Sequence, residues 1–194
     1  MVSIDISKRQ LDRLDQAIAG TGRKIRREIA TAVNATAKKS RGVINKQIRT
    51  ELATKKAAVD RVVAVTRRAS NQSESPTAAV TLSKTARISL KEFGARQTRA
   101  GSSYRISKST GRNTAQGAFM GPRPGATSVR LKGHVFKRQG KSRLPIRKLW
   151  GPSPWGVFVG KDMQGPTMKE TRDELEKQLE RRIRFVTLKA QGKI

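Results

Sequence analysis

The residue types that could carry catalysis are few in this chain, and each stands without the partners that its chemistry requires. The 194 residues include no cysteine and a single histidine, His134, so thiolate nucleophiles, disulfides and multi-histidine metal sites are not expected. We expect His134 to make a structural hydrogen bond in a strand or turn. Glu92 is the sole acid between residues 84 and 148, so a paired-carboxylate mechanism has no second member there. The sequence predicts no enzyme, no cofactor and no metal site.

One short motif suggests nucleotide binding. Gly140-Lys141-Ser142 has the sequence that ends the phosphate-binding loop of many nucleotide hydrolases. That loop needs a further glycine five residues before Gly140, where its backbone N–H groups surround the phosphates, and Val135 occupies this position. A basic turn between a strand and the next segment is therefore the favoured interpretation.

Basic side chains in loops rich in glycine and serine carry the stronger functional signal. Little acid surrounds them, and flexible loops suit contacts with phosphates that do not depend on base sequence. A solvated basic surface is the alternative. No zinc finger or helix-turn-helix pattern is present, and five Phe, one Tyr and two Trp are too few for a base-stacking platform. The candidate DNA-facing residues are Arg96, Arg99, Arg105, Lys108 and Arg112.

The charge of the whole chain supports a polyanionic partner. Lys and Arg number 43 against 14 Asp and Glu, a formal net charge of +29, and residues 84–148 alone hold 17 basic side chains and one acidic. Such a balance usually indicates nucleic acid, and less often an anionic membrane face. The longest apolar run, Val62 to Val65, is far shorter than the roughly 20 residues of a membrane span. We expect no membrane partner and a protein made and kept in the cytosol, or in an assembly formed there.

The elements that would position these residues begin with helices in residues 1–70. The spacing of Leu11, Leu14 and Ile18 predicts a short helix, and a longer one is predicted over about residues 21–50. Thr54 could cap a further short helix that ends at Val63. The apolar face of the long helix comprises Ile25, Ile29, Val33, Ala37, Ile44 and Ile48.

Residues 71–165 change to a strand-like pattern. The segments TAAVTLS, ARISLKEF, SSYRISKS, GAFM and GHVFKR predict a small antiparallel sheet, with long basic loops between its strands. Long loops in a compact domain usually bind a partner or become ordered in an assembly. We therefore expect an α+β protein of one domain with extensions.

Residues 166–194 predict an amphipathic C-terminal helix. Thr167 and Glu170 have the spacing of a capping box. The apolar stripe of this helix could pack on its own sheet or on a neighbouring subunit. Two tryptophans, in the proline-containing segment KLWGPSPWGVFVG, could likewise anchor in a partner's pocket or pack on the sheet edge. The candidate interface anchors are Trp150, Trp155, Leu175, Leu179 and Ile183.

Several segments together resemble the minor tail protein Z family of tailed bacteriophages and prophages. They are GAFM at 117–120, HVFKR at 134–138, GKSRLPI at 140–146 and Pro152-Ser153. The helical half, with ATKKAAVDRVV leading into ARISLKEFGARQTR, is similar to the same family. The resemblance spans most of the chain, whereas GPRPGATS at 121–128 looks like a variable loop.

This resemblance implies a structural virion protein that completes the tail at its head-proximal end, in the neck. By analogy with tail-completion and terminator proteins we expect a homo-oligomeric ring, a hexamer, in contact with tail-tube or terminator proteins, head–tail connector proteins and viral double-stranded DNA. Its location would be the virion, after assembly in the host cytoplasm. The basic block 84–148, or the basic face of the long helix, would line the lumen, and the anchors would join subunits. The alternative from composition is a free, sequence-independent DNA- or RNA-binding protein.

Overall fold

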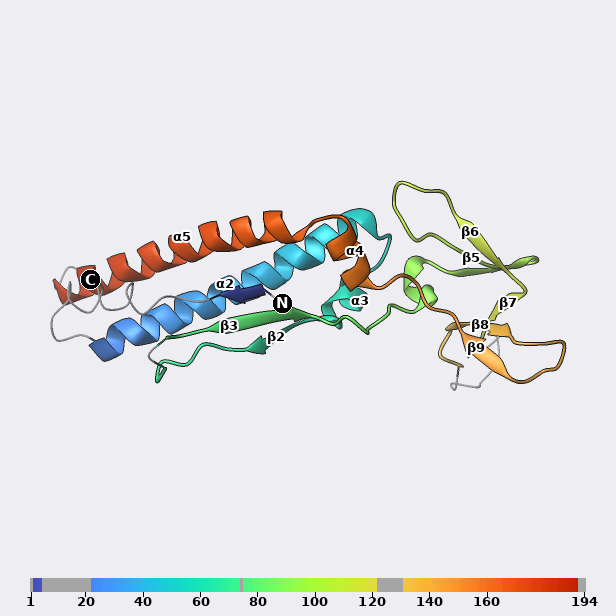
Figure 1. The fold of residues 1–194 in the computed structure, drawn as a ribbon, viewed down its shortest axis with the longest axis horizontal. Helices are drawn as coiled ribbons and strands as arrows, with labels where there is room; N and C mark the ends of the chain where they lie inside the picture. The colour runs from blue at the N-terminus through green and yellow to red at the C-terminus, as the bar shows by residue number, and fades with distance from the viewer. Residues whose placement is uncertain (1, 5–21, 74, 122–130, 192–194) are drawn as a thin grey trace. The chain divides into compact units, whose positions relative to one another are not determined.

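The chain forms two compact units of mixed helix and strand. A computed structural model describes residues 2–4, 22–73, 75–121 and 131–191 (Figure 1). The first unit comprises residues 1–44, 63–82 and 162–194, and the second comprises residues 45–62 and 83–161. The expected α+β class, with a long helix, small antiparallel sheets and a C-terminal helix, is confirmed. The expected helix around Leu11 and the loop 122–128 lie outside the described residues.

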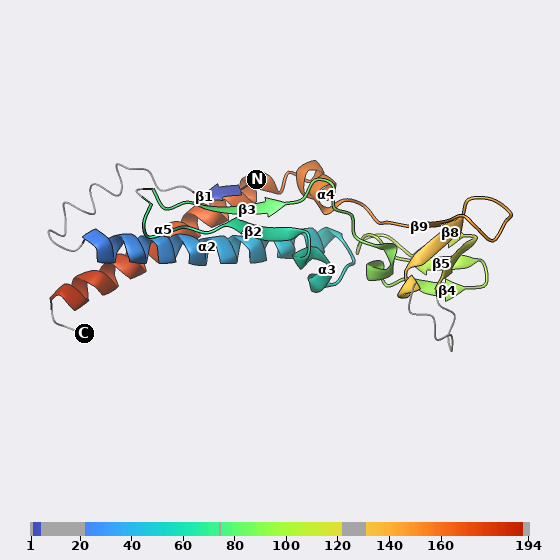
Figure 2. The same ribbon diagram turned by 90° about the horizontal axis from the view of Figure 1, so that it is seen from below.

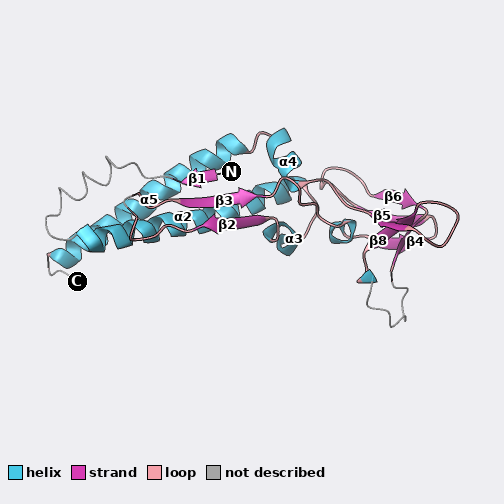
Figure 3. Cartoon of the chain, turned by 60° about the horizontal axis from the view of Figure 1, so that its bottom comes forward, coloured by secondary structure: helices cyan, strands magenta, loops and turns pink. Residues whose placement is uncertain are grey.

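The first unit is a three-stranded antiparallel sheet with two long helices on one face. Strands β1 (Val2–Ile4), β3 (Ala78–Leu82) and β2 (Val63–Arg67) are adjacent in that order. Helices α2 (Gly22–Glu51) and α5 (Gln164–Ala190) run behind the sheet in Figure 3. Figure 2 shows the same strands and helices after a 90° turn.

Alternation along the strands explains why the sheet is covered on one side. Val63 pairs with Leu82 and Val65 with Val80, and these side chains share one face. Val63, Val80 and Leu82 are buried. On the opposite face the hydroxyls of Thr66 and Thr81 lie 2.9 Å apart, and Thr66 is exposed.

Helix α2 begins and ends within one residue of the predicted span, and its apolar stripe is part of the buried core. Apolar residues four and seven positions apart lie on one continuous face of the helix. The predicted stripe is buried in full, at Ile25, Ile29, Val33, Ala37, Ile44 and Ile48.

A polar seam joins α2 to α5 beside this stripe. The Ser40 and Thr171 hydroxyls lie 2.8 Å apart, and Lys39 forms an ion pair with Glu174. Gln178 donates a hydrogen bond to Glu174 at 2.8 Å. The hydrogen bond from Gln178 and the one from Lys39 together lower the pKa of the Glu174 carboxyl, so this acid stays ionised at the helix interface.

The second unit contains two small antiparallel sheets. The first has the order β4 (Arg96–Thr98), β5 (Gly101–Tyr104), β6 (Asn113–Gln116), and the second has the order β7 (Ala118–Met120), β8 (Val135–Arg138), β9 (Ile146–Lys148). A short helix α3 (Lys56–Asp60), a 3-10 helix η1 (Leu90–Phe93) and a helix α4 (Pro154–Gly160) complete it.

Phe93 organises the centre of this unit. The ring is 1% exposed, and the backbone of Gly151 passes so close that a Cβ there would lie 2.2 Å from a ring carbon. Gly151 N–H donates to the Ile88 carbonyl at 2.8 Å, and Arg105 N–H donates to the Phe93 carbonyl at 3.1 Å. The backbone around Phe93 is thus tied to segments far away in sequence.

Several predicted elements differ from the observed ones. The segment 86–93 was expected as a strand, but it makes a single bridge at Ser89 and then the 3-10 helix η1. The expected capping box is wrong, because α5 begins at Gln164 and the buried Thr167 hydroxyl donates to the Met163 carbonyl at 2.7 Å. In the proline-containing segment of the two tryptophans, Pro154 starts α4, where its missing N–H leaves no unpaired donor.

We predict that Gly101→Ala destabilises the second unit. Gly101 has φ +150°, and an added Cβ would lie 2.1 Å from the Ala115 carbonyl oxygen across the β5–β6 pair. The clash is with backbone, so relief requires the strands to separate, and we expect a loss of about 1–3 kcal/mol in the free energy of unfolding.

Gly111→Ala is the matched control, because no atom lies within 4 Å of the added Cβ. Denaturant unfolding measures both variants. Equal stability of the two, within about 0.5 kcal/mol, would contradict the close approach at Gly101.

Candidate nucleic-acid interface

Positive charge is concentrated in the second unit. Its residues include 23 Lys and Arg against 3 Asp and Glu, whereas the first unit has 20 against 11. The predicted electropositive block 84–148 lies wholly within the second unit. A unit of this size with so large an excess of cations favours a polyanionic ligand.

All three acids of the second unit are already engaged by cations of the same unit. Asp60 pairs with Lys56 at 2.8 Å, Glu92 with Arg61 at 3.6 Å, and Glu51 with Lys161 at 3.8 Å. Glu92, the sole acid of the basic block 84–148, is therefore a salt-bridge partner of Arg61. The remaining cations have no carboxylate of their own unit to neutralise them.

Three of the five candidate DNA-facing residues have open head groups. Arg96 lies in β4, Arg99 follows it, and Lys108 lies in the loop after β5. All three are exposed, and in the described part of the chain no hydrogen bond or ion pair involves their charged groups. Their geometry suits contact with phosphates.

The other two candidates hold loops together. Arg105 Nε donates to the carbonyls of Ser107 at 3.2 Å and Thr110 at 3.0 Å, and a terminal nitrogen reaches the Lys108 carbonyl. The loop 105–110 is thus wrapped around its own arginine. The role of Arg105 in DNA contact stays a prediction, with part of its donor capacity used inside the chain.

Arg112 connects two segments of the unit. Its Nε donates to the Ser103 hydroxyl at 2.9 Å, and a terminal nitrogen donates to the carbonyls of Gly94 at 2.8 Å and Ser103 at 3.0 Å. Gly94 ends η1 with φ +62°, so Arg112 fixes the turn that leads from η1 into β4.

Sequence reasoning missed a groove that two arginines border. Arg99 and Arg138 line it, with Phe119 and Met120 from β7. The Arg138 guanidinium lies 5.6 Å from the centre of the Phe119 ring, and the Phe119 and Phe136 rings are 6.2 Å apart. The two-residue spacing of Phe136 and Arg138 in HVFKR was the available signal, because it places both side chains on one face of a strand.

His134 has the structural hydrogen bond that was expected. Its Nδ1 lies 2.8 Å from the Ser89 hydroxyl, and Ser89 is buried. Burial lowers the pKa of the imidazole, and the nearby charges of Lys148 and Lys91 lower it further. The ring is therefore neutral at pH 7, and a neutral imidazole in a cationic surrounding is suited to a structural role.

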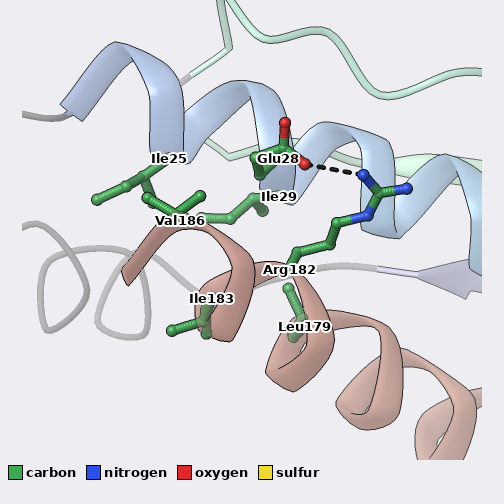
Figure 4. Close-up of a pocket in the computed structure, with 7 residues that line it drawn as sticks. All are labelled: Ile25, Glu28, Ile29, Leu179, Arg182, Ile183 and Val186. Atoms are coloured by element: carbon green, nitrogen blue, oxygen red, sulfur yellow. Dashed lines mark hydrogen bonds and ion pairs between the residues drawn. The ribbon is translucent and has the colours of Figure 1, made fainter. Parts of the chain in front are cut away.

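The candidate anchors of the C-terminal helix contact the protein's own α2. Leu179 and Ile183 line a small apolar pocket with α2, which Figure 4 shows in close-up. Arg182 closes its side with an ion pair to Glu28 at 3.0 Å. The other lining residues are Ile25, Ile29 and Val186. These anchors, and the half-buried Leu175, stay predictions as subunit contacts, with part of their surface used within the chain.

Both candidate tryptophans are covered by a lysine. The Lys148 ammonium lies 4.1 Å from the centre of the Trp150 ring, and the Lys84 ammonium lies 5.3 Å from that of Trp155. Trp150 is 47% exposed, whereas Trp155 is half-buried. Trp150 therefore presents more surface to a partner.

No group of three His, Cys, Asp or Glu that could hold a metal ion occurs among the residues that the structure describes. None of the described helices is both long and apolar enough to cross a bilayer. Comparisons of the chain with protein families, curated proteins and solved structures found no match.

We predict that His134 makes stability depend on pH. The folded-state pKa is lower than the usual value of about 6.5, so below that pH the unfolded chain binds a proton that the folded chain does not. Stability therefore falls as pH falls through about 6.5, and this contribution levels off below the folded pKa.

Unfolding of the native chain and of His134→Asn between about pH 7.5 and about pH 5.5 measures this effect, and the variant should have the flatter profile. NMR titration of the imidazole provides the second readout. A folded pKa above 6.5 would contradict the prediction.

We also predict that Arg112→Gln and Arg96→Gln differ in stability although each removes one charge. The first removes three hydrogen bonds between segments and should lower the free energy of unfolding by about 1 kcal/mol. The second removes an open head group and should change it by less than about 0.5 kcal/mol. Chemical denaturation compares them, and equal effects would exclude a loop-holding role for Arg112.

Proposed function

We propose that the protein is a structural component of a phage virion, a minor tail or tail-completion protein at the head-proximal end of the tail. The proposal begins from the resemblance of residues 117–120, 134–146 and 152–153 to the minor tail protein Z family. The observation that carries it is the second unit, in which the cations greatly outnumber the acids and every acid is already paired. A neck protein close to the viral DNA needs such a surface.

In this role the protein forms a homo-oligomeric ring, a hexamer, between the tail tube or its terminator and the head–tail connector. Exposed apolar side chains support the formation of subunit contacts, above all Trp150 in the second unit and Phe185 and Met168 on α5. The protein is assembled in the host cytoplasm, resides in the tail and neck of the virion, and has neither catalytic activity nor a cofactor.

The cations contact the viral duplex in the ring lumen. Arg96, Arg99 and Lys108 have exposed charged groups without partners in the described chain, so they can each make a weak, exchangeable phosphate contact. Many such contacts hold DNA without fixing its sequence or its position along the lumen.

A free, sequence-independent nucleic-acid-binding protein is the second candidate. The cation surplus of the second unit favours it equally, because phosphate binding by that surface requires no other virion component. The two functions differ in whether the chain assembles with tail tubes.

Light scattering and negative-stain imaging of the protein, alone and mixed with tail tubes, test the proposal. Rings, or caps at one end of the tubes, are the expected result. A monomer that leaves tubes unchanged but binds duplex DNA in a salt-dependent manner would refute the tail role and support the second candidate.

We predict that a triple variant, Arg96→Gln with Arg99→Gln and Lys108→Gln, still forms rings or caps but impairs DNA retention in particles. The affinity for duplex DNA should lose about one unit of salt slope per cation. Arg105 and Arg112 are left intact because they hold loops. The control removes the same charge from exposed residues of the first unit, Arg67, Arg68 and Lys169, each to Gln. Normal infectivity of particles with the first triple variant would refute the lumen assignment.

A further inference from the structure

The hairpin formed by β8 and β9 combines features that the proposed function does not use. We call residues 135–148 the basic hairpin. Its strands pair in antiparallel register, with Lys137 opposite Arg147. The connecting residues 139–145 are all exposed, and Gln139 N–H donates to the Pro145 carbonyl at 3.2 Å where the strands separate. Figure 1 shows this ribbon in orange, with β8 and β9 side by side.

The charge of the basic hairpin is of one sign only. Within it there are six cations and no acid, namely Lys137, Arg138, Lys141, Arg143, Arg147 and Lys148. Lys137 and Arg147 are exposed and stand directly opposite each other, a placement that destabilises a sheet when the charges are alike. An anionic ligand over this pair would remove the repulsion.

Four of the six cations are available to such a ligand. Arg138 lies over Phe119 and Lys148 over Trp150. The other four have no hydrogen bond or ion pair with the described residues, and all are exposed: Lys137, Lys141, Arg143 and Arg147.

An apolar side chain lies among these cations. Leu144 is 67% exposed, more than any other large apolar residue that the structure describes, and Pro145 beside it is also exposed. A lone exposed leucine is common on protein surfaces. This leucine lies in the loop of a ribbon whose charges are all positive, so a polyanion bound to the ribbon would come into contact with it.

We propose that the basic hairpin binds duplex DNA, with its cations on the phosphates and Leu144 inserted as a wedge between two base pairs from the minor groove. Leucine and proline wedges that unstack a base step and bend the duplex are a known device of proteins that bind the minor groove. The bend brings more phosphates within reach of the flanking cations. The site is distinct from the candidates Arg96, Arg99 and Lys108.

The shape and composition of the hairpin favour duplex DNA over other polyanions. A membrane surface would require a broad apolar face, and one leucine with one proline supplies little area to bury in lipid. Duplex RNA keeps its A-form geometry and is recognised mostly by shape and 2′-hydroxyl contacts, so a wedge has less to gain there. The inference requires only DNA contact, so it stands whether or not the protein joins a phage tail.

The wedge is tested by DNA bending. A duplex of about 30 base pairs with a donor and an acceptor dye at its two ends is titrated with the full-length chain, and energy transfer should rise on binding as the ends approach. Leu144→Ala should lose this rise while anisotropy still detects binding. Val159→Ala is the matched control, an exposed apolar residue of the same unit outside the hairpin, and it should bend DNA as the native chain does.

The phosphate contacts are tested by salt dependence. The hairpin variant combines Lys137→Gln, Lys141→Gln and Arg147→Gln. Its slope of log affinity against log salt should be smaller than that of the native chain by about 3. The control variant removes two lysines and one arginine of the same unit outside the hairpin: Lys46→Gln, Lys55→Gln and Arg87→Gln. The salt slope of this control should decrease clearly less than that of the hairpin variant.

Several outcomes would overturn the proposal. One is bending that survives in Leu144→Ala, and another is an equal loss of salt slope in the two triple variants. Equal affinity for duplex RNA with the same dependence on Leu144 would also overturn it. So would binding to vesicles of phosphatidylcholine and phosphatidylglycerol that requires Leu144 while DNA binding does not. Failure of the chain to cap tail tubes would refute the tail role and leave this inference untouched.

Discussion

The uncompensated positive charge of the second unit is the constraint to which the rest of its structure responds. With three acids, all engaged, the unit cannot neutralise its cations by ion pairing. Neutral hydrogen-bond acceptors of the unit bind some of these cations in place of carboxylates. Arginines donate to backbone carbonyls, as Arg105 and Arg112 do, and Lys91 donates to the Lys132 carbonyl at 2.7 Å. Other cations lie over the faces of aromatic rings in cation–π contacts. The few aromatic residues of the chain therefore contribute to electrostatics as well as to packing.

The first unit pairs cations with carboxylates where its two long helices meet. Its helices α2 and α5 meet through apolar side chains and through cation–carboxylate pairs, Glu28 with Arg182 and Lys39 with Glu174. These pairs are partly buried, where the attraction between opposite charges is less screened by solvent. The two units thus differ in how they treat charge as well as in architecture. The first joins its two helices with cation–carboxylate pairs, and the second presents most of its charge outward.

The sequence predicts the long elements well and the short polar ones poorly. Helix α2 has a sustained apolar period over thirty residues, which tertiary context did not override. Strands β4 and β6 have the sequences RQT and NTAQ, which show no apolar alternation. Their strand conformation depends on pairing with β5 more than on local propensity, so the sequence alone does not indicate it. The capping box failed because Thr167 is buried inside the first turns of a helix that begins earlier.

The candidate site was predicted in the same uneven way. Composition identified the basic segment and five of its cations. It could not distinguish Arg96, whose charged group is open, from Arg112, which donates to backbone carbonyls, because composition does not show which cations make such bonds. The pairing of Lys137 with Arg147 likewise depends on a strand register that the sequence does not specify.

The division of the chain into units has a consequence for how the protein folds as it is synthesised. The first unit is assembled from three separate stretches, and the two stretches of the second unit are inserted between them. The sheet strand β1 and helix α5 stand at opposite ends of the chain, yet both belong to the first unit. On the ribosome, β3 and α2 can meet early, whereas α5 emerges only after the whole second unit. The half of the molecule that begins to form first is therefore the last to be completed, and until then the apolar stripe of α2 lacks one of its two covers.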